Sequence, residues 1–210
     1  MQAATEVDYR AANRCIGVAH GDIKPSNFLI EQHEGEINCL LIDFGSCVIR
    51  GQDRFPTWNP PWNPPELGGD FVSHTLGFER LSQADLYALG LLCVHILLSL
   101  DSLRNAGLCF LREGQSDEEW EMTISQLEGA KSLPDDKSPE SGPGLLGPRI
   151  LKLVSQAGVD EERKVLLESI VRGTICSPPG RRTMPWSEVV RLGRDQLSFR
   201  YDSSNPVSIA

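Results

Sequence analysis

The sequence lacks the concentration of positive charge that a nucleic-acid-binding surface needs. Its 210 residues contain 20 Lys and Arg against 29 Asp and Glu, which gives a formal net charge of −9. The sequence pI is near 4.9. The densest basic spot is the single pair Arg181 and Arg182. The composition therefore argues against a basic stripe for nucleic acid and against a polybasic patch for a membrane surface.

Paired cysteines are also missing. Six cysteines are present, but none forms a CxxC pair and no histidine lies at metal-ligand spacing from them. They are Cys15, Cys39, Cys47, Cys93, Cys109 and Cys176. The interpretation that this pattern favours is scattered reduced thiols in an intracellular protein, with a structural disulfide or zinc site as the alternative.

No long apolar run is present. Residues 1–15 contain no apolar signal-peptide core. The longest uncharged stretch, Leu86–Leu100, has 15 residues, whereas a membrane span needs about 20. We therefore expect a buried core helix at 86–100, no membrane partner, and a cytoplasmic or nuclear location.

The hydrophobic content of 40% and charged content of 23% are ordinary for one globular domain with a real core. Short apolar runs at 27–30 and 37–42, separated by a polar segment with Gly35, predict a β-hairpin. The other periodic segments predict helices, with Ser82 as an N-cap for the central one. These helices are expected at about 2–13, 82–100, 117–127, 149–157, 160–172 and 187–197. The predicted class is α+β, mostly helical.

Three segments show no regular period. Residues 46–70 are rich in Pro, Gly, Trp and Asn and predict a long irregular loop. Residues 128–148 are rich in Pro, Gly, Ser and acidic residues and predict a flexible insertion. Residues 198–210 predict a polar tail.

Two polar motifs flank the predicted hairpin. The first is His20-Gly21-Asp22-Ile23-Lys24-Pro25-Ser26-Asn27, and the second is Asp43-Phe44-Gly45. Asp22 is suited to orient or accept a proton, and Lys24 to neutralise a phosphate oxygen. Asn27 and Asp43 offer the oxygen ligands that Mg²⁺ prefers, and the hairpin is expected to bring them together.

With these motifs in this order, the chain resembles the C-terminal lobe of a eukaryotic protein kinase, of the serine/threonine type because of Lys24. The resemblance covers about residues 5–193. The run WNPPWNPPE at 58–66 most resembles kinase-like proteins of filamentous fungi. A kinase-like C-lobe over 1–197 is therefore expected, with an activation segment at 43–66.

The resemblance implies transfer of the γ-phosphoryl group of Mg·ATP to a Ser or Thr hydroxyl of a protein substrate. Asp22 is implied as the base, Lys24 as the phosphate contact, and Asn27 and Asp43 as ligands of Mg²⁺ and cofactor. His20, Phe44 and Gly45 complete the two loop motifs.

The resemblance also implies two structural contacts. Asp85, in ADLYALG, is expected to hold the backbone of the loop around Asp22. Pro64-Pro65-Glu66 resembles the end of an activation segment, and Glu66 is expected to pair with Arg182. An ordinary pair of surface charges is the alternative for Glu66 and Arg182.

The chain departs from the family in several places. Only 19 residues precede His20, so no Gly-rich loop, strand lysine or partner glutamate is expected, and the ATP-binding N-lobe is predicted to be missing. Gly21 replaces the usual arginine. Asn59 stands where a threonine normally contacts the catalytic Asp and Lys, and Thr57 is the nearest threonine that a shifted loop would bring in.

Three interpretations remain open on sequence alone. The chain is a kinase domain represented by its C-lobe, a catalytically inactive scaffold that docks proteins through the segment 55–67, or an unstable product of a truncated gene. Trp58 and Trp62 are expected to pack, to dock a substrate, or both. The substrate, and whether Met1 is the true start, are not determined by the sequence.

Overall fold

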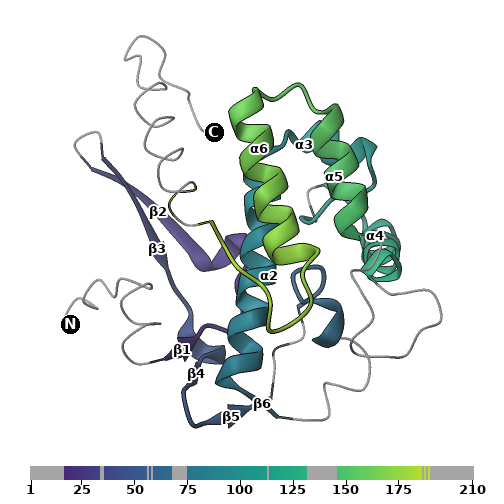
Figure 1. Ribbon diagram of the computed structural model, residues 1–210. Coiled ribbons are helices and arrows are strands. Elements are labelled where there is room, and N and C mark those ends of the chain that lie inside the picture. The colour runs from purple at the N-terminus through teal and green to yellow at the C-terminus, as the bar shows by residue number, and fades with distance from the viewer. Residues whose placement is uncertain are drawn as a thin grey trace.

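The computed structural model describes residues 17–33, 36–55, 57, 59–67, 75–112, 114–131, 146–185, 187 and 189. Short paired strands lie on one side of a central helix, and the other helices lie on the opposite side (Figure 1). The predicted α+β, mostly helical class is confirmed. The helices predicted at 2–13 and 187–197 and the tail at 198–210 lie outside the described residues, apart from Ser187 and Val189.

Helix α2, Phe78–Leu97, is the central element. The prediction that it starts at Ser82 is wrong, because Phe78 and Leu81 are buried and extend the apolar face of the helix by one turn. The residue before the helix is Gly77, which has extended backbone. The helix also ends earlier than predicted, since Ser99 accepts a hydrogen bond from the Ser102 amide and caps α3, Leu100–Asn105.

The predicted hairpin is confirmed. Strand β2, Phe28–His33, pairs antiparallel with β3, Glu36–Leu41, and Phe28 lies opposite Leu41. The Ile42 amide donates to the Asn27 carbonyl at 2.9 Å. The hairpin thus closes directly between Asn27 and Asp43, which places the two predicted Mg²⁺ ligands at its base.

The segment 46–70 is less irregular than predicted. Strand β4, Val48–Ile49, pairs with β1, Val18–Ala19, and β5, Asp53–Arg54, pairs with β6, Leu76–Gly77. A 3₁₀ turn covers Pro65–Leu67. These two-residue strands are too short to produce a periodic signal in sequence.

Helix α4, Asp117–Lys131, runs past its predicted end at Leu127, and α5, Leu146–Gln156, begins before its predicted start. The prediction of a flexible segment over 128–148 is therefore wrong at both ends. Leu127 and Ala130 are buried one turn apart, and Leu146 and Ile150 likewise share a buried face. Residues 132–145 lie outside the described part of the chain.

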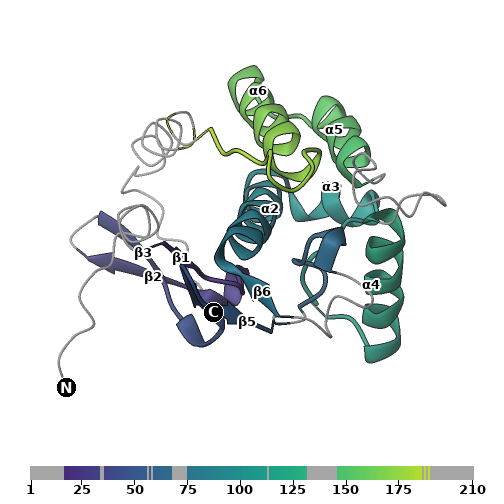
Figure 2. The ribbon, with the colours of Figure 1, turned by 60° about the horizontal axis from the view of Figure 1, so that its bottom comes forward.

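Helix α6, Glu161–Ile170, starts from Asp160, whose carboxylate accepts from the Arg163 amide at 2.9 Å. It continues into a π turn at Val171–Ile175. Both α6 and the π turn contact α2, which also contacts β1, β4 and β6 (Figure 2). The main core is centred on α2 and includes Ile23, Tyr87, Leu91, Leu127, Ile150 and Leu167. Within the described residues, no helix is both long and apolar enough to cross a lipid bilayer.

Candidate functional site

The side chain of Asp22 lies at the centre of a hydrogen-bonded cluster between β1 and β2. Its Oδ2 lies 2.9 Å from Lys24 Nζ and accepts from Asn27 Nδ2 at 3.0 Å. Its Oδ1 accepts from Asn59 Nδ2 at 2.7 Å. Asp22 is only 8% exposed. Both carboxylate oxygens are therefore held in place by side chains from two separate segments.

The surroundings of Asp22 shift its pKa in opposing directions. Burial is the largest single influence and raises the pKa, but hydrogen bonds from Lys24, Asn59 and Asn27, with the charge of Lys24, lower it. The net pKa lies below the ordinary value of 3.8. Asp22 is therefore a carboxylate at neutral pH and a weak base in this state of the site.

The local backbone explains why Lys24 and Asn27 reach Asp22. Lys24 has extended backbone and Pro25 opens a 3₁₀ turn, Pro25–Asn27, with the proline at a position that needs no amide donor. The turn brings Asn27 back so that its Nδ2 also donates to the Asp22 carbonyl at 2.7 Å. The two side chains thus converge on Asp22, whereas the sequence pattern predicted Asn27 only as a Mg²⁺ ligand beside Asp43.

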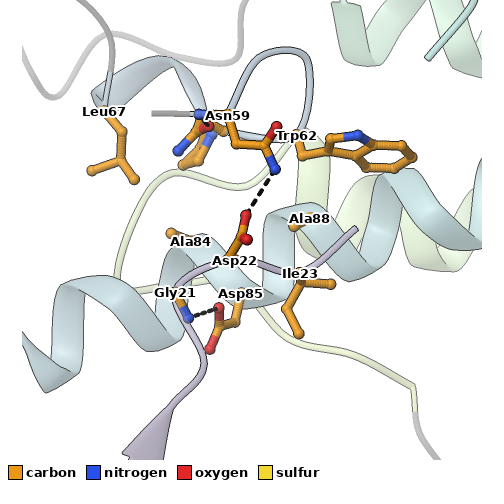
Figure 3. Close-up of a pocket in the computed structure, with 11 residues that line it drawn as sticks. Gly21, Asp22, Ile23, Asn59, Trp62, Leu67, Ala84, Asp85 and Ala88 are labelled. Carbon is orange, nitrogen blue, oxygen red and sulfur yellow. Dashed lines mark hydrogen bonds between the residues drawn. The ribbon is translucent and has the colours of Figure 1, made fainter. Parts of the chain in front are cut away.

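Asp85 holds the backbone of this loop from α2. Its carboxylate accepts from the His20 amide at 2.7 Å and from the Gly21 amide at 2.9 Å. Asp85 is 3% exposed. This is the contact expected from the resemblance, although Asp85 lies in the third turn of the longer α2 and not at its start. Figure 3 shows the Gly21 bond beside Asp22.

Gly21 is required by the local backbone. Its φ is +75°, and a Cβ at this position would lie 2.7 Å from the Ser46 carbonyl oxygen. The region of positive φ is strained for side-chain-bearing residues, and the close neighbour here is backbone. An arginine at position 21 would therefore require the Ser46 segment to move.

His20 links the two motif loops. It is fully buried, its Nε2 lies 3.0 Å from the Ile42 carbonyl oxygen, and its Nδ1 accepts from the Asp22 amide at 3.3 Å. Its ring meets the ring of Phe44 edge-on, with centroids 5.0 Å apart. Because Nδ1 accepts a hydrogen bond from the Asp22 amide, the ring hydrogen is on Nε2. Nε2 therefore donates to the Ile42 carbonyl.

The Asp43-Phe44-Gly45 loop is held more loosely. Asp43 has positive φ, is exposed, and accepts from the Gly45 amide through Oδ1 at 3.2 Å. Phe44 is 42% exposed despite its contact with His20. Gly45 sits inside the short 3₁₀ turn Phe44–Ser46.

Asn27 and Asp43 are the residues that would hold a Mg²⁺ ion. Because the Asn27 amide nitrogen donates to Asp22, its side-chain oxygen is the atom that would face a cation, and the Asp43 carboxylate would supply the second ligand. Mg²⁺ in nucleotide sites takes one or two protein oxygens and completes its shell with phosphate and water. Within the described residues, no three His, Cys, Asp or Glu side chains form a metal-binding group.

Asn59, and not Thr57, makes the contact to Asp22. The Thr57 hydroxyl lies 2.5 Å from the Ser46 hydroxyl, and its carbonyl accepts from Asn63 Nδ2 at 3.0 Å. The idea that a shifted loop brings in Thr57 is therefore wrong. The Asn59 side chain spans the gap to Asp22 because its loop is held close to α2 (Figure 3).

Glu66 and Arg182 form a bidentate pair. Arg182 Nη1 and Nη2 each donate to a Glu66 carboxylate oxygen, the second at 2.9 Å. The Arg182 guanidinium also donates to the carbonyls of Gln83 and Ser177 and lies 5.0 Å from the Tyr87 ring centroid. The side chain of Arg182 is buried, so the alternative of two ordinary surface charges is wrong.

Trp62 is a packing residue. It is buried, and its ring lies 5.8 Å from Phe110 and 6.3 Å from His95, measured between centroids. Pro61, Asn63, Pro64 and Leu67 are buried with it. Phe55 and Pro65 in the same segment are exposed, and Trp58 lies outside the described residues. The docking face expected at 55–67 therefore stays a prediction.

Lys131 was not anticipated from sequence, because it lies in the segment predicted to be flexible. Only 2% of the residue is exposed. Its Nζ donates at 2.6 Å to each of three acceptors, the Pro61 carbonyl, the Asn63 carbonyl and Glu128 Oε1. Burial lowers the pKa of Lys131 from 10.5, and the charge of Glu128 opposes that shift. The only sequence signal is the Glu128–Lys131 spacing on one helix face.

A shallow depression that opens to solvent lies against Asp22. Asp22, Asn59 and Asp85 form part of its polar lining, and Ile23, Trp62 and Ala88 part of its apolar lining (Figure 3).

The five described cysteines, Cys39, Cys47, Cys93, Cys109 and Cys176, are unpaired thiols.

A scan against models of known protein families finds no match for this sequence, and a search of curated proteins finds none either. The geometry of the described residues is therefore what supports any assignment of function.

Proposed function

We propose that this chain carries the catalytic half of a protein serine/threonine kinase, which transfers the γ-phosphoryl group of Mg·ATP to a Ser or Thr hydroxyl of a protein. The observation that carries the proposal is the cluster in which Lys24, Asn27 and Asn59 converge on the carboxylate of Asp22.

Phosphoryl transfer demands positioning and charge neutralisation more than covalent chemistry, because its transition state is loose. A carboxylate with a lowered pKa suits this requirement. Asp22 is held by directed hydrogen bonds and would orient the acceptor hydroxyl rather than remove its proton early. Lys24, 2.9 Å from Asp22, would place a positive charge beside the transferred phosphoryl group.

The position of the hairpin also supports the proposal. Asn27 and Asp43 flank the closed β2–β3 pair, and His20 bridges from the Asp22 loop to Ile42. Bound Mg²⁺ would neutralise phosphate charge at this point. The arrangement of the two motifs around one hairpin supports the proposal.

The second candidate is a binding module without catalysis, and the exposed apolar side chains favour it. Phe44 is 42% exposed, and several apolar side chains on or beside the short strands are exposed as well. They are Leu29, Ile30, Ile42, Ile49 and Phe55. Exposed apolar side chains mark an interaction site or an aggregation-prone face where they form a contiguous patch. Cooperative thermal unfolding without any Mg·ATP binding would favour this candidate.

The test begins with the native transcript. The sequence encoded upstream of Met1 is read, and the longest in-frame polypeptide is assayed for transfer from γ-labelled ATP. Asp22→Asn is expected to lower the transfer rate by at least about 100-fold while leaving ATP affinity unchanged. Asp43→Asn is expected to weaken ATP binding only when Mg²⁺ is present.

Asp101→Asn is the matched control, since Asp101 is an exposed carboxylate on α3 outside the cluster. This control variant should leave both the transfer rate and the ATP affinity unchanged. Near-normal transfer by Asp22→Asn would contradict the proposed mechanism.

A further inference from the structure

Lys131 is a buried cation with every donor in use. An ammonium group has three N–H donors, and here they reach Pro61, Asn63 and Glu128, each at 2.6 Å. Burying a cation costs several kcal/mol unless its hydrogen bonds are satisfied. Two of the acceptors are backbone carbonyls of a single turn. Two of the three hydrogen bonds of the Lys131 ammonium group therefore form only when that turn lies against α4.

The turn at 59–63 is itself closed by hydrogen bonds. The Trp62 amide donates to the Asn59 carbonyl at 2.9 Å, and the Asn63 side-chain oxygen accepts from the Asn59 amide at 2.5 Å. The Asn63 side-chain nitrogen donates to the Thr57 carbonyl at 3.0 Å. A turn braced in this way moves as a unit, so an anchor on Pro61 and Asn63 also places Asn59.

We propose that Lys131 is a positioning residue that anchors the 59–63 turn to α4 and thereby holds the Asn59 side chain against Asp22. Helix α4 stands at the edge of the helical body (Figure 2). The connection runs from Lys131 Nζ to the Pro61 and Asn63 carbonyls, along the turn to Asn59, and from Asn59 Nδ2 over 2.7 Å to Asp22 Oδ1. The relevance of Lys131 to phosphoryl transfer rests on the proposed function, whereas the connection itself does not.

The experiment observes Asn59 directly by NMR in the 210-residue chain. The two side-chain amide protons of Asn59 are assigned by their loss in Asn59→Ser. The proton donated to the Asp22 carboxylate should lie downfield, so the two Hδ2 signals should be widely separated. Asp22→Asn, which removes the charged acceptor, defines how far this separation falls when the contact is weakened.

Lys131→Met keeps the apolar stem as far as Cε and removes the ammonium group. We expect the Asn59 Hδ2 separation to fall at least as far as in Asp22→Asn. Leu127→Ala is the matched control, because Leu127 is fully buried one turn earlier on α4. It should destabilise the chain and leave the Asn59 signals in place.

If Lys131→Met does not fold, Lys131→Gln decides the question. Glutamine is one bond shorter and cannot reach both carbonyls, so the Asn59 separation should again fall. An unchanged Asn59 separation in either folded variant would overturn the proposal and leave Lys131 as a purely structural residue.

The outcome is independent of catalysis. A loss of the Asn59 signature in Lys131→Met would support the positioning role even if the longest in-frame polypeptide transferred no phosphoryl group, a result that would contradict the proposed function alone. Transfer activity in that polypeptide, with unchanged Asn59 signals in Lys131→Met, would support the proposed function and overturn the positioning role.

Discussion

Asp22 and Asp43 are carboxylates on adjacent loops, yet their surroundings differ sharply. Asp22 is 8% exposed and contacts three side chains, whereas Asp43 is exposed and accepts one hydrogen bond from Gly45. Asp85 on α2 also holds the Asp22 loop, whereas the Asp43 loop contacts that loop through the rings of Phe44 and His20. The contrast teaches that the packing of the helical body positions Asp22, while the position of Asp43 depends mainly on its own turn.

The largest effect is expected at the support of the Asp22 loop. Asp85→Ala removes the acceptor of the His20 and Gly21 amides and leaves both donors unsatisfied in a buried place. Hydrogen bonds to charged groups contribute about 1.5–3 kcal/mol each, so we expect the free energy of unfolding to fall by about 3 kcal/mol or more. Denaturant unfolding monitored by circular dichroism measures this loss in the free energy of unfolding. A loss below about 1 kcal/mol would mean that the loop does not depend on Asp85.

The glycines of the two loops provide a second comparison. Gly21→Ala places a Cβ 2.7 Å from the Ser46 carbonyl at a φ of +75°, and we expect it to destabilise the fold by about 2 kcal/mol. In Gly45→Ala the nearest atom is Asp43 Oδ1 at 3.0 Å, the end of a side chain that can rotate. The free energy of unfolding should fall by well under half as much in Gly45→Ala as in Gly21→Ala. If Gly21→Ala and Gly45→Ala unfolded at the same midpoint temperature, the two loops would not differ in how strictly they require glycine.

The pKa of Asp22 tests the contact from Asn59. Removing the amide in Asn59→Ala takes away one of the influences that lower this pKa, so the pKa should rise. Because the folded-state pKa lies below 3.8, Asp22 stabilises the fold above about pH 4 and this contribution is lost as the pH falls through the folded-state pKa. The variant should therefore lose less stability on acidification below pH 4. The carboxyl ¹³C titration of Asp22 measures the shift, and an unchanged or lower pKa would contradict the contact.

The smallest effect is expected at Asp43. Asp43→Asn retains a side-chain oxygen for the Gly45 amide, and asparagine tolerates positive φ. The free energy of unfolding should change by less than about 0.5 kcal/mol. A larger loss in chemical denaturation would show that Asp43 has a structural role similar to that of Asp22, and the contrast between the two loops would no longer hold.

Several contacts could be predicted because they depend on residue type and order along the chain. The turn at Pro25–Asn27 has a local signal in its proline, although the hydrogen bonds from Asn27 to Asp22 were not predicted. The hairpin that brings Asn27 near Asp43 follows from two apolar runs around a polar segment. The long-range contacts of Asp85 and of Glu66 with Arg182 were predicted only because the motifs resemble those of a known fold.

Other contacts could not be predicted because they depend on tertiary packing. Whether Asn59 or Thr57 reaches Asp22 depends on how the 59–63 turn is seated, and nothing local distinguishes the two side chains. Lys131 looked like part of a flexible segment, since Pro, Gly and Ser follow it closely. Its burial is visible only once α4 is packed against that turn.

The sequence by itself determined which residues are able to do the chemistry and where the backbone must turn, since these depend on side-chain type, proline and glycine placement and short-range periodicity. The tertiary structure decided which of these residues touch, how deeply Asp22 is buried, and that Lys131 faces inward. Burial and hydrogen bonding between segments far apart in the chain depend on the packing of whole helices, and no local pattern encodes that packing.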